Sequence, residues 1–230
     1  MKTNNYQSGG PMTRHLPTLP VGQSIFEDLR LDKALYIDKT MYLPMLRNAG
    51  KFVFCAQPRR FGKTLTVHAL DAYHSGRTEL FRGLAAEEHM SSPGFIPRPV
   101  IRLDMNTVAG SRDIDILEKK ILVRLEVNAG RHKVSQTGAD SAETFLRLLE
   151  DVHAASGKKV VLLIDEYDAP IIKLIERERL IYDELLFAKT RLVIGEFYSQ
   201  IKSAEEHIEF AFITGVTKFS RMAYFPFSTT

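Results

Sequence analysis

Four short apolar runs, separated by longer amphipathic segments, constrain the fold of this chain more than any other feature. The runs span residues 51–56, 99–103, 159–164 and 208–213. Each has the length of a β-strand. The third is continuously apolar from Val160 onward, which is typical of a strand buried on both faces. We therefore expect these four segments to form one sheet.

Helical patterns occupy the gaps between the apolar runs. In one segment the apolar residues recur at helical spacing: Ile114, Leu117, Ile121 and Leu125. We expect Gly130 to end that helix, because glycine commonly stops helices. A second helix is predicted by Asp140 and Glu143, which form a capping-box pattern, and we expect it to end at Gly157. A third helix is expected at about residues 182–202.

Strands that alternate with helices predict crossover connections and a mostly parallel sheet with helices on both faces. The expected fold is therefore a three-layer α/β/α arrangement. Ligands in such sheets bind at the carboxyl ends of the strands. The residues that directly follow the apolar runs are therefore the candidates for a functional site.

Composition excludes several other classes of protein. Of the 230 residues, 44% are hydrophobic, and a net charge of +3 is too small to predict nucleic-acid binding. The single cysteine, Cys55, excludes an intramolecular disulfide or a multi-cysteine zinc site. No apolar run approaches the ~20 residues that span a bilayer. We expect a cytoplasmic protein with a disordered leader (1–15), one domain (16–221) and a short tail (222–230).

The first apolar run leads into a loop that is suited to phosphate. The loop, residues 57–64, is followed by a helical pattern and carries Gly62, Lys63 and Thr64 at the helix start. Free backbone N–H groups and the positive end of the helix dipole favour an anion there. Lys63 can reach terminal phosphates, and the Thr64 hydroxyl can bind Mg²⁺. Gln57 stands where the strict glycine-rich motif requires glycine, so this loop alone is also compatible with an ordinary helix N-terminus.

The third and fourth apolar runs end in polar residues at the same predicted edge of the sheet. Asp165 and Glu166 directly follow the third run. An aspartate there can hold Mg²⁺, and a neighbouring glutamate can orient or deprotonate an attacking water. Thr214 and Gly215 follow the fourth run, and the threonine hydroxyl can bond a phosphate or form part of a simple turn.

Together these segments resemble a known family, the AAA-ATPase-like domain of bacterial and archaeal proteins that commonly carry a PD-(D/E)XK nuclease domain behind it. The resemblance rests on Leu16-Pro17 with Gly22, Tyr36-Ile-Asp-Lys-Thr40, Pro58-Arg-Arg-Phe-Gly-Lys-Thr64, Ile164-Asp-Glu-Tyr-Asp-Ala-Pro170 and Thr214-Gly-Val-Thr-Lys-Phe-Ser220. It implies an additional-strand P-loop NTPase core. In such a core, strand 208–213 lies between strands 51–56 and 159–164.

The resemblance also implies ATP and Mg²⁺ as cofactors. It assigns nucleotide binding to five loop residues, Arg60, Phe61, Gly62, Lys63 and Thr64, and places Lys63 on the β- and γ-phosphates. It assigns Mg²⁺ to Thr64 and Asp165, the catalytic water to Glu166 and sensing of the γ-phosphate to Thr214. For Arg59 and Arg60 three alternative roles remain open: contact with phosphate, contact with a partner, or pairing with Asp168.

Two further segments keep open interpretations. Residues 36–40 precede the loop strand, where such domains place the wall around the adenine, but Asp38 and Lys39 are equally suited to pair with each other. Tyr167 and Asp168 are equally typical of a helix start before Pro170.

Members of this family continue well beyond the last matching motif, whereas this chain stops ten residues after Ser220. The resemblance therefore implies a domain truncated before a fifth strand, a helical lid and the nuclease domain. Three functions compete: an ATPase that hydrolyses ATP weakly or in assembly with the missing parts, a nucleotide-gated regulatory module of a nuclease-type defence or mobile-element protein, and an inactive truncated product. A homo-oligomer is a further expectation. Nucleic acid is expected only through the absent nuclease domain.

Overall fold

The computed structural model describes residues 18–178 and 183–217, with the side chains of 177 and 178 excluded. Four parallel strands form one sheet: β1 (Phe52–Ala56), β2 (Val100–Asp104), β3 (Val160–Asp165) and β4 (Ile208–Gly215). The strand order is β1-β4-β3-β2. The last of the described strands therefore lies between the first and third, as an additional-strand core requires, and the predicted α/β fold is confirmed.

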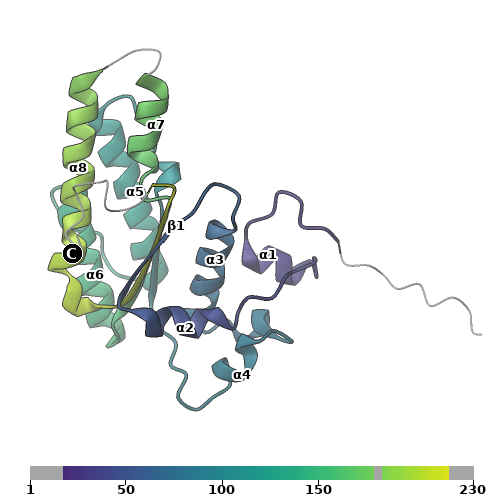
Figure 1. Ribbon diagram of the computed structural model, residues 1–230. Coiled ribbons are helices and arrows are strands. Elements are labelled where there is room, and N and C mark those ends of the chain that lie inside the picture. Colours follow the sequence, from purple (N-terminus) through teal and green to yellow (C-terminus); the bar gives the residue numbers. More distant parts are fainter. Residues whose placement is uncertain (1–17, 179–182, 218–230) are drawn as a thin grey trace, which may run out of the picture.

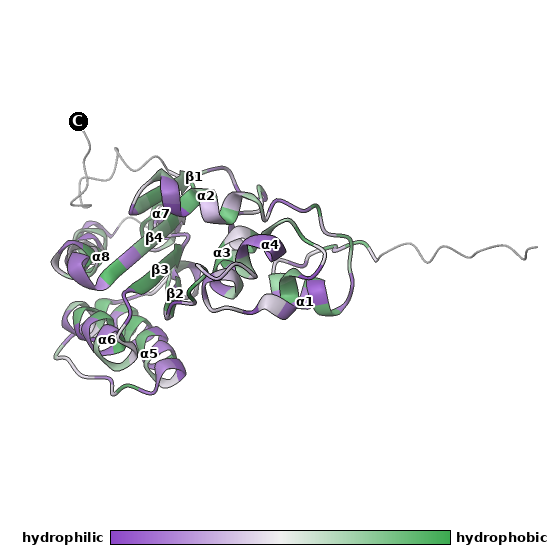
Figure 2. Ribbon diagram, turned by 90° about the horizontal axis from the view of Figure 1, so that it is seen from below, coloured by the Kyte–Doolittle hydropathy of each residue, from purple (hydrophilic) through white to green (hydrophobic). Residues whose placement is uncertain are grey.

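Helices cover both faces of the sheet (Figure 1). The helices are α1 (Phe26–Leu31), α2 (Tyr42–Ala49), α3 (Lys63–His74), α4 (Ala86–Met90), α5 (Ile114–His132), α6 (Ser141–Ser156), α7 (Ala169–Glu178) and α8 (Glu184–Ser203). Three short 3₁₀ turns, η1 (Thr78–Phe81), η2 (Met105–Thr107) and η3 (Glu205–His207), complete the described elements. Helices α5, α6 and α8 lie on one face of the sheet, and α3 with α1, α2 and α4 on the other (Figure 2).

The two faces of the sheet belong to two hydrophobic cores, because successive side chains of a strand point in opposite directions. In β3, Leu162 and Ile164 pack in the core with α5, α6 and α8. Val161 and Leu163 pack in the core with α3 and α1. All four are fully buried, which explains why this segment is continuously apolar rather than alternating.

Local signals for the helix ends are partly confirmed. Asp140 accepts a hydrogen bond from the backbone N–H of Glu143 (2.8 Å), and α6 ends at Gly157 in the left-handed conformation. The expectation that Gly130 ends α5 is wrong. The helix continues to His132 and ends with Lys133 in the left-handed conformation, because buried Ala129 and Leu125 hold this last part against the core. The predicted leader, the tail and residues 218–221 lie outside the described residues.

Candidate functional site

The loop between β1 and α3 lies at the carboxyl edge of the sheet. The backbone N–H of Gln57 donates to the carbonyl of Gly215 (3.1 Å), which ties the start of the loop to the end of β4. Gly62 precedes α3 with a φ of +79°, a left-handed conformation that glycine adopts without steric cost. The loop therefore runs from a fixed strand end into the helix N-terminus, whose free N–H groups suit an anion.

Lys63 is held inside this loop. Its side chain is buried, and its ammonium donates to the carbonyls of Gln57 (2.8 Å) and Pro58 (3.0 Å). No carboxylate among the described residues forms an ion pair with it. A buried cation that is bonded to carbonyls and forms no direct ion pair among the described residues favours a bound anion.

A cavity of about 630 Å³ opens beside the loop. It is lined by residues of the N-terminal segment, the loop and the end of β3: Val21, Gly22, Gln23, Ser24, Arg60, Gly62, Lys63, Thr64, Leu65 and Glu166. Most of the residues that the sequence assigned to phosphate and Mg²⁺ therefore surround one space. Thr64 and Glu166 both line this cavity, although they are 102 positions apart in the sequence.

Two residues that line this cavity hold a strained backbone. Four described residues other than glycine have a positive φ, and two of them, Lys33 and Lys133, directly follow helix ends where such a conformation is common. The other two are Arg60 (φ 70°) and Glu166 (φ 51°). A left-handed conformation of a residue with a Cβ costs about 1–2 kcal/mol, and such strain concentrates at functional sites.

The carboxyl ends of β3 and β4 are joined by side-chain contacts. The hydroxyl of Thr214 donates to Oδ1 of Asp165 and accepts from the backbone N–H of Glu166 (3.2 Å). Asp165 and Thr214 are both buried. The single hydroxyl proton of Thr214 is thus directed at Asp165, so in this structure the threonine orients the aspartate. The contact of Thr214 with a γ-phosphate, which the resemblance implies, stays a prediction.

Asp104 is a third acidic residue at this edge that the sequence analysis did not select. It ends β2 and stands in register with Asp165. Desolvation raises the pKa of Asp104, and the negative charge of Asp165 raises it further. The same signal that marked Asp165, an acid directly after an apolar strand, would have found it.

Glu166 has an electrostatic environment suited to accepting a proton. Its pKa is raised above the ordinary value, first by burial and then by the charges of Asp165 and Asp104. Lys63 and Arg59 oppose this shift. A carboxylate with a raised pKa is a stronger base, and such perturbed groups are common at catalytic sites.

Asp168 fixes the segment that follows β4. Its Oδ2 accepts from the backbone N–H groups of Val216 (2.9 Å) and Thr217 (2.7 Å) and from the Thr217 hydroxyl (2.7 Å). Its Oδ1 is buried and has no hydrogen-bond partner among the described residues. Asp168 directly precedes α7, so it stands at the expected helix start, but its carboxylate is used for this tertiary contact. The suggested pairing of Arg59 or Arg60 with Asp168 is not found among the described contacts.

The three loop residues Arg59, Arg60 and Phe61 have different environments. Arg59 forms an exposed ion pair with Glu176 of α7 (3.1 Å). Arg60 is exposed and forms no hydrogen bond or ion pair with the described residues. Phe61 is 67% exposed and lines a second, apolar pocket instead of the loop cavity.

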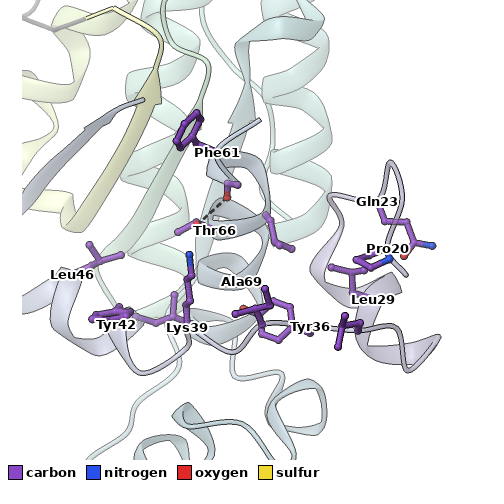
Figure 3. A pocket seen from close by; sticks show the side chains of 15 residues that line it. Pro20, Gln23, Leu29, Tyr36, Lys39, Tyr42, Leu46, Phe61, Thr66 and Ala69 are labelled. Carbon is purple, nitrogen blue, oxygen red and sulfur yellow. Dashed lines mark hydrogen bonds between the residues drawn. The ribbon is translucent and has the colours of Figure 1, made fainter. Parts of the chain in front are cut away.

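This apolar pocket, about 520 Å³ in volume, adjoins the loop cavity and shares Gln23, Gly62 and Leu65 with it. Apolar side chains of residues 20–46 and of α3 line it, together with Lys39, Tyr36 and Tyr42 (Figure 3). The hydroxyl of Thr66 is turned back onto the carbonyl of Gly62 (3.0 Å), and the amino group of Lys39 points toward Thr66 (Figure 3).

Asp38 does not pair with Lys39 in the structure. Its carboxylate accepts from the backbone N–H and hydroxyl of Thr40 and from the backbone N–H of Ala85 (2.7 Å). Asp38 therefore anchors the segment before α2 to the start of α4, and this leaves the Lys39 side chain to line the pocket.

In the described part of the chain, no group of three or more His, Cys, Asp and Glu side chains is arranged to hold a metal ion by itself. Mg²⁺ in phosphate-binding proteins is held by one or two protein oxygens together with phosphates and water. The Thr64 hydroxyl and the carboxylate of Asp165 are oxygen donors of this kind at one sheet edge. Within the same described residues, no helix combines the length and apolar character that a membrane crossing needs.

A parallel sheet with an inserted strand and a glycine-lysine-threonine loop at its carboxyl edge defines a P-loop-like α/β protein. A family model described as a predicted AAA-ATPase matches residues 20–225, so the chain belongs to the AAA-ATPase-like family. A similar protein of Azotobacter chroococcum mcd 1, described as an uncharacterized protein in the vnfD 5' region, is 33% identical over 208 residues. The match covers 90% of this chain but 39% of that relative's length. No solved structure matches the chain.

Proposed function

We propose that this chain binds Mg-ATP through the loop of residues 57–64 and hydrolyses it slowly. The observation that carries the proposal is Lys63, a buried cation at a helix N-terminus with no carboxylate partner among the described residues. A bound triphosphate would replace the two loop carbonyls as partner of the ammonium. Gly62 would allow the backbone to approach the phosphates, and Arg60 would add a second positive charge.

The apolar pocket gives the nucleotide base a place beside the phosphates. It adjoins the loop cavity at Gly62, so a ligand bound across both would put its phosphates at Lys63 and its base near Tyr36 and Tyr42. Burial raises the pKa of Tyr36 to about 12, so this ring stays neutral and acts as an apolar wall. A mostly apolar pocket with a few polar groups is typical of a small-molecule binding site.

Mg²⁺ would be held by the Thr64 hydroxyl and by Asp165, which the Thr214 hydroxyl keeps in place. When bound, the ion supplies neutralisation of the charge on the phosphates. Glu166 would accept a proton from the attacking water, because its carboxylate lines the same cavity and has a raised pKa.

Turnover separates this function from a nucleotide-gated module that only switches a partner. We would measure phosphate release and Mg-ATP affinity for the wild type and for Glu166→Gln. The proposal predicts that Glu166→Gln keeps the affinity within about threefold and loses at least about 100-fold in turnover. Equal turnover in both proteins would contradict hydrolysis at Glu166 and favour the regulatory role.

A further inference from the structure

We propose that Arg59 is a catalytic residue of this site. Its guanidinium leaves Glu176 and contacts the γ-phosphate, so that the chain supplies from its own loop the positive charge that stabilises the transition state. The inference rests on the proposed function and goes beyond it. It assigns a catalytic role to one of two adjacent arginines, and it treats the ion pair with Glu176 as the resting position of that side chain.

Arg59 does not itself line the loop cavity, but its two neighbours in the chain belong to the loop site. The residue before it, Pro58, accepts a hydrogen bond from the Lys63 ammonium (3.0 Å), and the residue after it, Arg60, lines the cavity. A side chain that starts between these two positions has the length to reach either the cavity or the neighbouring helix α7. In the structure it reaches α7, where it meets Glu176.

The charge of Arg59 acts at the catalytic carboxylate. Lys63 and Arg59 are the cations that lower the pKa of Glu166 against the effect of its burial. The charge of Arg59 is therefore felt at Glu166 even while the side chain is paired with Glu176.

The contact with Glu176 is suited to exchange. The side chains of Arg59 and Glu176 are 58% and 54% exposed, and ion pairs exposed to this degree contribute little stability. A γ-phosphate carries more negative charge than a carboxylate and presents several oxygens to the planar guanidinium. The phosphate therefore competes well for Arg59 once the nucleotide is bound.

The reaction in which Arg59 acts is an in-line hydrolysis. The oxygen of a water forms a bond to the γ-phosphorus while the bond from that phosphorus to the bridging oxygen breaks. The electron pair of the broken bond stays with the β-phosphate of ADP, and the proton of the water passes to Glu166. Arg59 contacts the γ-phosphate oxygens, on which negative charge is spread in the transition state.

The test is single-turnover hydrolysis of Mg-ATP with the protein in excess, for the wild type, Arg59→Ala, Arg59→Lys and Arg60→Ala. We expect Arg59→Ala to lower the hydrolysis rate constant about 10³-fold with little change in Mg-ATP affinity. Arg60→Ala is the matched control, since it removes the same charge one position away. It should mainly weaken affinity. Arg59→Lys should recover part of the rate.

Glu176→Gln tests whether the ion pair with Glu176 holds Arg59 away from the γ-phosphate. Removal of this carboxylate frees Arg59, so the rate constant should rise about two- to fivefold, the range that an exposed ion pair can give. In the double variant with Arg59→Ala the rise should disappear. A rise that persists without Arg59 would overturn the role of Glu176 as its resting partner.

Two results would overturn the catalytic role. The first is Arg59→Ala with the wild-type rate constant, while Glu166→Gln abolishes hydrolysis. The second is a rate constant that still increases with protein concentration after all Mg-ATP is bound, because a group supplied by another copy would give that dependence and a group of the same chain would not. Failure of the proposed function looks different, since the wild type would then bind Mg-ATP without hydrolysing it, or Mg-ATP binding would be absent or unaffected by Lys63→Ala.

Discussion

The hydroxyl of Thr214 donates a hydrogen bond to the carboxylate of Asp165 and accepts one from the backbone N–H of Glu166. This one side chain therefore joins the ends of two neighbouring strands, because it orients the carboxylate of Asp165 and holds the backbone at Glu166. Since Thr214 is fully buried, water cannot replace its contacts. The relative placement of the acids is consequently a property of the fold and is present without a ligand.

We expect Thr214→Val to destabilise the protein by about 1–3 kcal/mol, because it leaves the N–H of Glu166 and the carboxylate of Asp165 without this partner in a buried place. Thr214→Ser keeps the hydroxyl and should lose less than about half as much. Urea unfolding measures both. Equal losses would mean that the methyl group contributes as much as the hydroxyl, and this would contradict the leading role of the hydroxyl.

The pH dependence of turnover should report Glu166. Burial and the neighbouring charges of Asp165 and Asp104 raise the pKa of this carboxyl, and only its ionised form accepts a proton. Turnover should therefore fall on acidification, with a midpoint above the ordinary glutamate value of 4.5. The pH profile of kcat/KM, which reports the groups of the free protein, measures the midpoint. A midpoint at or below 4.5 would contradict the raised pKa of Glu166.

Gly215→Ala should disturb the site through packing. A Cβ at this position would lie 2.4 Å from the Tyr167 ring and 2.9 Å from Oδ1 of Asp168, so the chain must shift. We expect a loss of about 1–3 kcal/mol in the free energy of unfolding. Gly94→Ala is the matched control, because nothing lies within 4 Å of a Cβ there. Thermal and urea unfolding of the two variants should differ clearly, and similar stabilities would contradict the close packing at Gly215.

His74 should make the fold sensitive to acid. Burial against Phe210 lowers its pKa to about 3 from 6.5, so the folded protein keeps this ring neutral while the unfolded chain protonates it. Between these values the unfolded state binds more protons, and stability falls as the pH falls. At pH 5 the contribution amounts to about 2 kcal/mol of lost stability.

His74→Leu removes this titration. We expect the free energy of unfolding of the variant to change less between pH 7 and pH 5 than that of the wild type. Unfolding in urea at the two pH values measures the difference. The same pH dependence in both proteins would show that folding does not lower the pKa of His74.

The sequence predicted the sheet because the information is local. The run 160–164 is continuously apolar, and the acids that follow it are placed by the strand end alone. The inserted position of β4 came from the family resemblance, and the structure shows the same strand order. The boundary of α5 was missed because burial of Ala129 outweighs the tendency of Gly130 to stop a helix.

The parts of the site that could not be predicted depend on contacts between distant segments. Asp38 turns to the backbone of Ala85, and Arg59 meets Glu176, and neither pairing leaves a pattern in the sequence. The apolar pocket forms where residues 20–46 fold against α3. Asp104 was a different case, because the local signal was present and was not used.

The most direct test of the account is a titration of the chain with Mg-ATP, by fluorescence of a labelled ATP analogue, beside Lys63→Ala. The account predicts saturable binding that requires Mg²⁺ and is lost in the variant, since Lys63 supplies the buried cation of the loop. The circular dichroism spectrum of the variant, unchanged from that of the wild type, is the control for folding. Equal binding by both proteins, or no binding by a folded wild type, would contradict the account.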